Sequence, residues 1–203
     1  MNNTFQKYFN YFKTRIDSSN SWNAYTPYEL RIVGTFNYLN DAEKSHKLLD
    51  FFFSHQRPKG WNHWAEVVWN NAKAPEFIGD MPHTWVGSDY INAIRSFFVF
   101  ENEQKNSLII ANGLKMEWIN DTIGVVVKNL PTYYGIVNYS IKKLSDTYFL
   151  ELDGDLTIPE GGIKVKNFWK NRSAIDELDS KNEINLMQNY IEIKNIPARI
   201  RIR

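Results

Sequence analysis

Acidic, imidazole and indole side chains gather in one stretch of this chain, residues 57–90. The stretch holds four of the seven tryptophans, Trp61, Trp64, Trp69 and Trp85. It also holds the titratable residues His63, Glu66, Glu76, Asp80, His83 and Asp89. A connection longer than about 12–15 residues in a compact domain usually has a function. Flat aromatic surfaces beside a few acids are typical of sites that bind and cleave sugars. A buried aromatic cluster that braces a long connection would have the same composition.

Glu66 is the acid with the most suggestive neighbours, because it lies in the segment WNHWAEVVW. If residues 63–69 form a short helical or extended piece, tryptophans would surround its carboxylate. Such a desolvated carboxylate would suit proton transfer near neutral pH. A carboxylate that pairs with an arginine, or that caps a turn, explains the same residue equally well.

The other acids of the stretch have simpler explanations. Asp80 lies in IGDMPH, between a glycine and a proline, where a role in a turn is favoured over catalysis. Asp89, or Ser88 before it, is predicted to cap a helix. Glu76 follows Pro75 and has no distinguishing context.

A metal site is not predicted, although His63, Glu66, Asp80 and His83 are of ligating types. Their spacing matches no compact metal motif. The chain also lacks a G-x-S-x-G nucleophile elbow and the glycine-rich loops of nucleotide-binding proteins. We therefore expect neither a metal nor another cofactor.

Composition limits the classes of partner. The chain has 203 residues, 43% of them hydrophobic and 15% aromatic, enough for a substantial core. The formal net charge of +1 gives no electrostatic reason to expect nucleic acid or a membrane as partner. There is no cysteine, which excludes disulfides and thiolate chemistry. The start carries no export signal, so a cytoplasmic protein is expected, or a secreted or periplasmic one if the chain is a fragment.

The first hundred residues have a helical period. Phe5, Phe9, Phe12 and Ile16 form one apolar stripe. Thr26 is predicted to cap a second helix that ends at Asn40, with Glu29 as its capping-box partner. Asp41 is predicted to cap a third helix as far as Pro58, in a hairpin with the second. A fourth helix is predicted to follow Asp89 and to fade after residue 101.

Beyond that point the period changes to two. The predicted strands are 108–112, 124–128, 136–142, 148–152, 163–166, 190–194 and 198–202, and residues 171–181 are predicted to be a surface excursion. The arginines near the end alternate with apolar residues, as in a strand with one exposed face. The chain is thus predicted to be α+β, with a helical part over 1–104 and an antiparallel β-sandwich over 105–203.

The segments RPKGWNHWAEVVW and PEFIGDMPHTWVGSDYINAIRSFFVFE closely resemble the end of the catalytic domain in bacterial six-hairpin glycosidase-like proteins. These are (α/α)6 toroids related to glucoamylases and disaccharide phosphorylases. GIVNYSIKK and LTIPEGGIKV resemble the small β-sandwich that closes such chains. The resemblance is tight over residues 57–101, and MPHTWVGSDY is its most specific string.

The resemblance implies roles for individual residues. Glu66 matches the catalytic base, which in an inverting enzyme activates water. Trp61, Trp64, Trp69 and Trp85 resemble the aromatic lining of the sugar cleft, and Asp80 and His83 are candidates for contacts with hydroxyl groups. An inverting enzyme also needs an acid about 6.5–9.5 Å away. In the family that acid comes from an earlier hairpin, which this chain lacks.

Two functions follow from this partial match. The chain is either the C-terminal portion of a glycoside hydrolase or a non-catalytic carbohydrate-binding or interaction module. A third interpretation is a structural remnant whose tryptophans only pack. One helical hairpin cannot bury all of the apolar surface of Phe5, Phe9, Phe12 and residues 51–53. We therefore expect a homo-oligomer, or a partner chain that supplies the missing helices.

Overall fold

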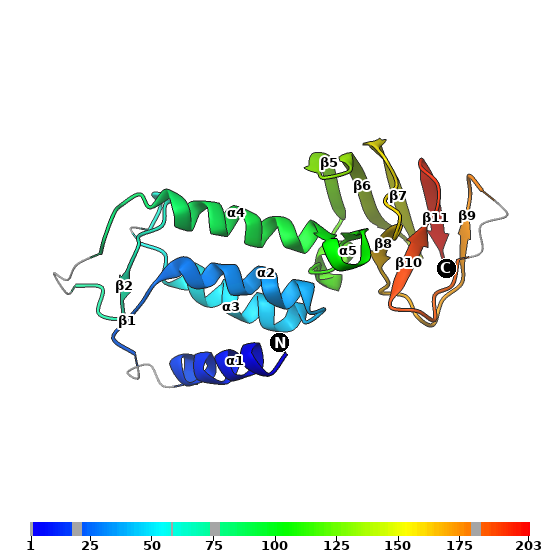
Figure 1. Cartoon of the computed structure of the whole chain (residues 1–203). Helices are drawn as coiled ribbons and strands as arrows, with labels where there is room; N and C mark the ends of the chain where they lie inside the picture. The colour runs from blue at the N-terminus through cyan, green and yellow to red at the C-terminus, as the bar shows by residue number, and fades with distance from the viewer. Residues whose placement is uncertain (1, 18–21, 58, 74–77, 180–183) are drawn as a thin grey trace. The chain divides into compact units, whose positions relative to one another are not determined.

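The computed structural model describes residues 2–17, 22–57, 59–73, 78–179 and 184–203. The chain forms two compact units, Met1–Ser96 and Phe97–Arg203. The fold is α+β, with helices dominating the first unit and strands the second (Figure 1). The division falls earlier than the predicted boundary at 104. Residues 99–102 were predicted to be the end of the fourth helix, but they form a strand of the second unit.

The helices of the first unit follow the apolar period of the sequence. They are α1 (Asn2–Asp17), α2 (Leu30–Tyr38), α3 (Ala42–Ser54) and α4 (Thr84–Phe98). A single 3-10 turn, η1 (Pro27–Glu29), leads into α2 and has Thr26 as its N-cap, as predicted. The helices α2 and α3 form the predicted hairpin, and the Asp41 side chain caps α3 by accepting a hydrogen bond from the Lys44 N–H at 3.3 Å.

The start of α4 differs from the prediction. The helix begins at Thr84, about one turn before the predicted caps Ser88 and Asp89. Asp89 lies inside the helix, and its carboxylate forms an ion pair with Arg31 at 2.7 Å. A tertiary partner therefore accounts for this aspartate better than a cap does.

The predicted apolar stripe is buried inside the first unit. Phe9, Phe12, Phe51 and Phe52 are all buried. The rings of Phe12 and Phe51 meet edge to face with centroids 5.2 Å apart, which joins α1 to α3. Because α1 packs onto the α2–α3 hairpin, most of the expected apolar patch is covered; Phe5 is half-buried, and Phe53 keeps 41% of its surface exposed.

Glu29 has a different role from the predicted capping-box residue. Its carboxylate accepts hydrogen bonds from the Arg15 guanidinium at 2.8 and 3.2 Å, and another from the Tyr8 hydroxyl. Only 6% of the Arg15 side chain is exposed. Burial lowers the pKa of Arg15, but the hydrogen bonds and charge of Glu29 raise it more, so the net shift is upward. The hydrogen bonds of Glu29 with Arg15 and Tyr8 therefore connect α1 to η1, just before α2.

The second unit contains two sheets. One has the strand order β10–β8–β4–β3 and the other β5–β6–β7–β11–β9. The bounds of the strands are β3 (Val99–Asn102), β4 (Ser107–Ile110), β5 (Val125–Thr132), β6 (Gly135–Leu144), β7 (Thr147–Leu156), β8 (Ile163–Lys166), β9 (Ala174–Asp176), β10 (Tyr190–Ile193) and β11 (Ala198–Ile202). The inward faces of both sheets contribute to one buried apolar cluster, which includes Leu108, Ile110, Val137, Ile141, Leu150, Val165, Ile191 and Ile200.

All seven predicted strands are present, but four features of this unit were not predicted. The strands β4 and β8 pair in parallel, so the unit is not purely antiparallel. The segment predicted as a surface excursion contains β9, which pairs with the edge of β11. The strand β3 and the short helix α5 (Met116–Asn120) were also missed. In β11, Ile200 and Ile202 are buried while Arg199 is exposed, which confirms the predicted single exposed face.

The pH dependence of stability is expected to follow from three tyrosines, the buried Tyr25 and Tyr139 and the half-buried Tyr8. Burial is the main cause that raises the pKa of each hydroxyl in the folded chain. In the unfolded chain the pKa is about 10. Stability contributed by these groups is therefore complete below a pH of about 10 and is lost as the pH rises beyond it. Tyrosinate absorbance, followed together with circular dichroism, should show these groups titrating only as the chain unfolds.

Tyr139→Phe should make the alkaline transition less steep, because it removes one group that releases its proton on unfolding. Titration of all tyrosines at a pH of about 10, with the folded circular dichroism spectrum intact, would contradict the expectation.

Within the described ranges, no helix has both the length and the apolar character needed to cross a membrane.

Candidate functional site

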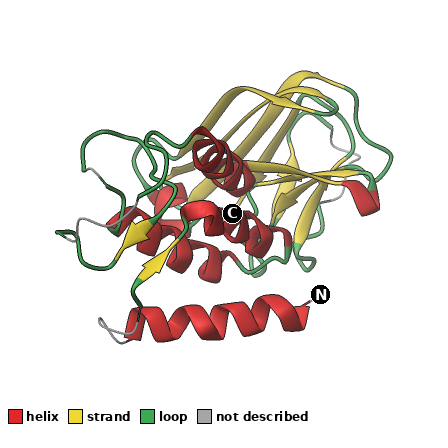
Figure 2. Cartoon of the chain, turned by 60° about the vertical axis from the view of Figure 1, so that its left-hand side comes forward, coloured by secondary structure: helices red, strands yellow, loops and turns green. Residues whose placement is uncertain are grey.

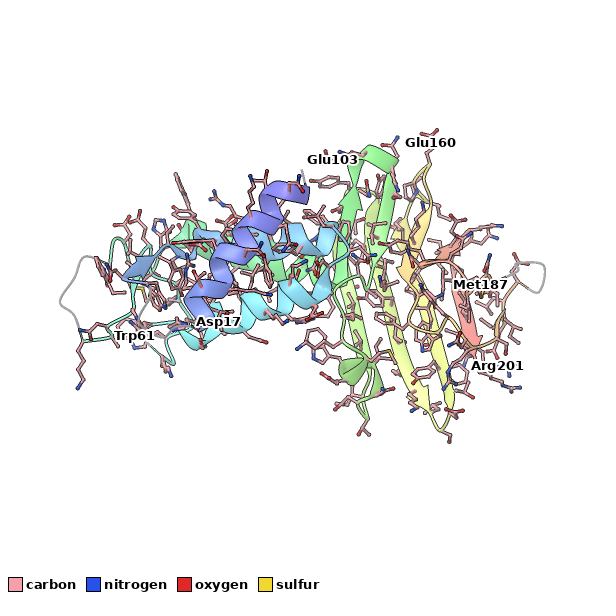
Figure 3. All side chains as sticks on the ribbon, turned by 90° about the horizontal axis from the view of Figure 1, so that it is seen from below. Asp17, Trp61, Glu103, Glu160, Met187 and Arg201 are labelled. Carbon is pink, nitrogen blue, oxygen red and sulfur yellow. The ribbon has the colours of Figure 1, made fainter. Side chains whose placement is uncertain are left out.

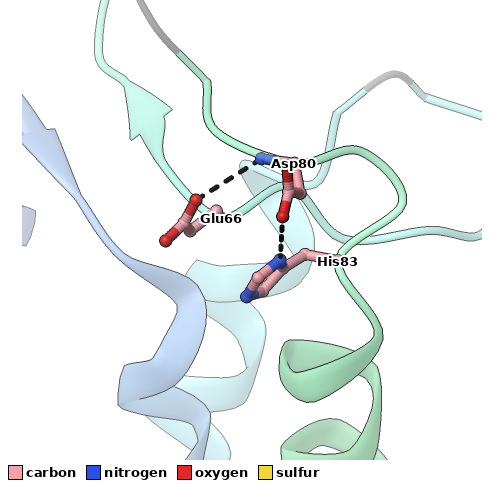
Figure 4. A group of neighbouring side chains, drawn as sticks. All are labelled: Glu66, Asp80 and His83. Carbon is pink, nitrogen blue, oxygen red and sulfur yellow. Dashed lines mark hydrogen bonds and ion pairs between the residues drawn. The ribbon is translucent and has the colours of Figure 1, made fainter.

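Two backbone segments of the first unit run side by side and form the candidate site. Glu66 N–H donates to the Asp80 carbonyl at 3.3 Å, and Val67 N–H donates to the Ile78 carbonyl at 3.0 Å. His83 N–H donates to the Trp64 carbonyl at 2.8 Å. This pairing folds the long aromatic stretch back on itself, next to the start of α4 (Figure 4).

The pairing brings Glu66, Asp80 and His83 together. One potential donor atom from each lies within 4.8 Å of the others. The Asp80 N–H donates to Glu66 Oε2 at 3.4 Å, and His83 Nδ1 lies 3.9 Å from Asp80 Oδ2 (Figure 4). The exposed fraction of the side chain is 12% for His83 and 87% for Asp80. The group thus combines the nearly buried imidazole of His83, the half-buried carboxylate of Glu66 and the solvent-exposed carboxylate of Asp80.

Tyr28 is a member of the site that the sequence did not indicate. It lies in η1, and its hydroxyl is hydrogen-bonded to His83 Nε2 at 2.5 Å. The rings of the two residues meet edge to face with centroids 5.4 Å apart. This contact fixes the orientation of the imidazole and leaves Nδ1 facing Asp80.

An open cavity of about 410 Å³ contains these groups. It is lined by Tyr28, Glu66, Asp80, Pro82, His83, Thr84 and Trp85. The indole of Trp85 is 70% exposed, and its ring centroid lies 6.4 Å from that of His83. The cavity therefore offers one flat apolar surface beside several hydrogen-bonding groups.

The other tryptophans of the stretch do not line this cavity. Trp64 is buried against Tyr90, with ring centroids 5.4 Å apart. Trp69 pairs with Ala24 in the short ribbon formed by β1 (Ala24–Tyr25) and β2 (Val68–Trp69), and lines a separate cavity of about 160 Å³ (Figure 2). Trp61 is exposed on the loops of this unit (Figure 3). Of these four tryptophans, only Trp85 lines the cavity that Glu66 lines.

A second cavity, of about 500 Å³, adjoins the first and shares Pro82, His83 and Thr84 with it. His63 lies in this second cavity and not in the group formed by Glu66, Asp80 and His83. Ile91 of α4 lines it with an exposed side chain. Glu76 lies outside the described residues.

The spacing of the two carboxylates limits their chemistry. Glu66 and Asp80 offer oxygens no more than 4.8 Å apart. An inverting glycosidase needs its carboxyl groups about 6.5–9.5 Å apart, with the sugar bond and a water between them. The backbones of the two residues are also hydrogen-bonded, so both side chains belong to one wall of the cavity. In the conformation described, Asp80 is therefore not placed as the general acid of an inverting pair.

Gly79 makes the close approach of these segments possible. Its φ is +70°, and a Cβ placed there would collide with Glu66 Oε2 and would lie 2.5 Å from Glu66 Cβ. Gly60 has a similar φ of +83°, but an added Cβ would meet nothing within 4 Å. The two glycines share the backbone conformation and differ only in crowding.

Gly79→Ala is expected to reduce the free energy of unfolding by about 2–4 kcal/mol, since both left-handed strain and overpacking apply. Gly60→Ala should cost about 1 kcal/mol, since strain alone applies. Urea denaturation of both variants checks this prediction. Equal losses would mean that crowding against Glu66 is absent.

Comparison with known proteins adds no relative. No protein-family model matches the chain, and neither a curated protein nor a solved structure matches it.

Proposed function

We propose that this chain is a carbohydrate-active protein that binds an oligosaccharide at the Glu66–Asp80–His83 cavity. The observation that carries the proposal is the exposed indole of Trp85 in the same cavity as these three polar side chains. Pyranose rings have an apolar face that packs on an indole and a rim of hydroxyls that need hydrogen-bonding partners. Carboxylates bind such hydroxyls by strong, charge-assisted hydrogen bonds.

The arrangement of elements supports a relation to the six-hairpin glycosidases. We propose that the helical unit corresponds to the last hairpins of an (α/α)6 toroid, and that the second unit corresponds to the closing β-sandwich. The α2–α3 hairpin, and two sheets that share one apolar cluster, agree with this assignment.

Within this proposal Glu66 is the catalytic base, and the general acid comes from another copy or another chain. Phe9, Phe12, Phe51 and Phe52 are buried within the helical unit, which leaves only a small apolar surface, such as Phe53, for a partner to cover. A separate acid is needed because Asp80, in the conformation described, does not stand opposite Glu66 at the distance that inversion requires. Saccharide binding without turnover is a second candidate function, because Asp80 lies on the same side of the cavity as Glu66 and not across it.

Trp85→Ala is the test of the proposed function. We expect the wild-type chain to bind at least one member of a panel of oligosaccharides in calorimetric titrations. The variant should bind the same sugar about tenfold more weakly or worse, because it loses the stacking surface.

Trp61→Ala is the matched control, because Trp61 is exposed to 63%, close to the 70% of Trp85, but does not line the cavity. The Trp61→Ala variant should bind the sugar with the same affinity as the wild type. Equal losses in the two variants, or a wild-type chain that binds no member of the panel, would overturn the proposal.

A further inference from the structure

We propose that Glu66, Asp80 and His83 bind a divalent first-row transition-metal ion, Zn²⁺ or Mn²⁺. Sequence spacing matched no metal motif, because the ligands come from two segments that meet only through backbone pairing. This inference goes beyond saccharide binding and does not depend on it.

The donor set has the right composition for such an ion. It offers one imidazole nitrogen and two carboxylates within 4.8 Å of one another. Imidazole is a ligand for Zn²⁺ and related ions, and carboxylates are accepted by Zn²⁺ and Mn²⁺ alike. Three protein ligands leave positions for water or substrate, as in catalytic metal sites.

The distances between the three ligand atoms are only slightly longer than those in a metal site. Metal bonds of about 2.0–2.2 Å hold neighbouring donors roughly 3–3.5 Å apart. His83 Nδ1 and Asp80 Oδ2 are 3.9 Å apart, and the Asp80 side chain is almost fully exposed. The exposed Asp80 side chain is free to move toward His83 Nδ1, and Glu66 already offers an oxygen within 4.8 Å of the other two ligand atoms.

The His83 imidazole has the hydrogen-bonding partner that a metal-ligating histidine usually has. A ligating histidine usually forms a hydrogen bond through its other ring nitrogen, which fixes its tautomer and orientation. Nδ1 is the ligand on the side of Asp80 when His83 Nε2–H donates to the Tyr28 hydroxyl oxygen, the tautomer that metal binding requires.

The charge of the cluster also favours a cation. In the part of the chain that the structure describes, no lysine or arginine forms an ion pair with Glu66 or Asp80. The nearby Arg31 is engaged by Asp89 at 2.7 Å. Two carboxylates this close repel each other, and an ion bound between them would replace the repulsion by attraction.

The test measures metal binding by the full chain without an affinity tag, since a histidine tag would bind the same ions. After treatment with a chelator and removal of the chelator, the protein is titrated with Zn²⁺, Mn²⁺ and Mg²⁺ in a calorimeter. We expect one ion per chain, with Zn²⁺ binding more tightly than Mn²⁺ and Mn²⁺ more tightly than Mg²⁺. Mg²⁺ binding as tightly as Zn²⁺ would overturn the assignment of His83 as a ligand.

Asp80→Asn should weaken Zn²⁺ binding at least tenfold, and Tyr28→Phe about tenfold through the orientation of His83. Asp80 is so exposed that its variant is expected to fold, which circular dichroism verifies. Asp50→Asn, an exposed acid on α3, is the control and should bind like the wild type. Equal Zn²⁺ affinity in Asp80→Asn and Asp50→Asn would overturn the proposal.

Failure of this inference can be told from failure of the proposed function. If the chain binds no metal but Trp85→Ala still weakens sugar binding, only the metal proposal is overturned. Absence of sugar binding, with Zn²⁺ binding that still depends on Asp80, overturns only the saccharide proposal.

Discussion

Glu29→Ala is expected to lower the free energy of unfolding of the helical unit by about 3–5 kcal/mol. The substitution leaves the Arg15 guanidinium, 6% exposed, without its carboxylate. It also removes the acceptor of the Tyr8 hydroxyl. A buried charge without a partner keeps its desolvation cost and loses the attraction that offsets it. Urea denaturation followed by the helical circular dichroism signal measures the loss.

Two further variants separate the buried charge from other causes. Glu43→Ala breaks a solvent-exposed pair with Lys47 and should change stability hardly at all. The double variant Arg15→Met with Glu29→Leu should recover most of the loss, because it leaves no charge to be buried. A double variant as unstable as Glu29→Ala would show that packing, and not an unpaired charge, determines the effect.

Glu29 also shows which parts of the helical unit can be predicted from sequence. The apolar period is a local signal, so the helices and the α2–α3 hairpin were predicted close to their observed places. Residue types that cap helices also form ion pairs across a fold, and only the tertiary partner decides between the two. Glu29 and Asp89 were both predicted as caps, and both pair instead with arginines, Arg15 and Arg31. The parallel pairing of β4 with β8 escaped prediction because strand order is not local.

The site was predictable in its residue types but not in its geometry. Glu66, Asp80 and His83 stood out as candidates, yet nothing periodic in the loop indicates that residues 64–67 pair with residues 78–83. Tyr28 was missed because its partner His83 lies 55 positions away. Tryptophan identity alone did not separate the exposed Trp85 from the buried Trp64, since both lie in equally aromatic segments.

Glu66→Gln is expected to reduce any glycan hydrolysis by this chain, alone or completed by a partner, by about 10²–10⁴-fold. The amide has nearly the shape of the carboxylate, and its oxygen can still accept the hydrogen bond from the Asp80 N–H. It cannot accept a proton from the attacking water. Sugar affinity should therefore change little while kcat falls, which reducing-sugar assays and calorimetry measure separately.

The same variant also removes a proposed metal ligand, so the two roles must be separated. Assays with a chelator present isolate the role of Glu66 as a base, because no ion then occupies the site. A loss of kcat that persists with the chelator supports proton transfer by Glu66, whereas a loss seen only with added Zn²⁺ or Mn²⁺ assigns the effect to metal binding. Glu117→Gln, an acid of the other unit, controls for the loss of a charge and should keep full activity. A Glu66→Gln chain as active as the wild type under both conditions would exclude Glu66 as the base and leave saccharide binding without turnover as the function of the cavity.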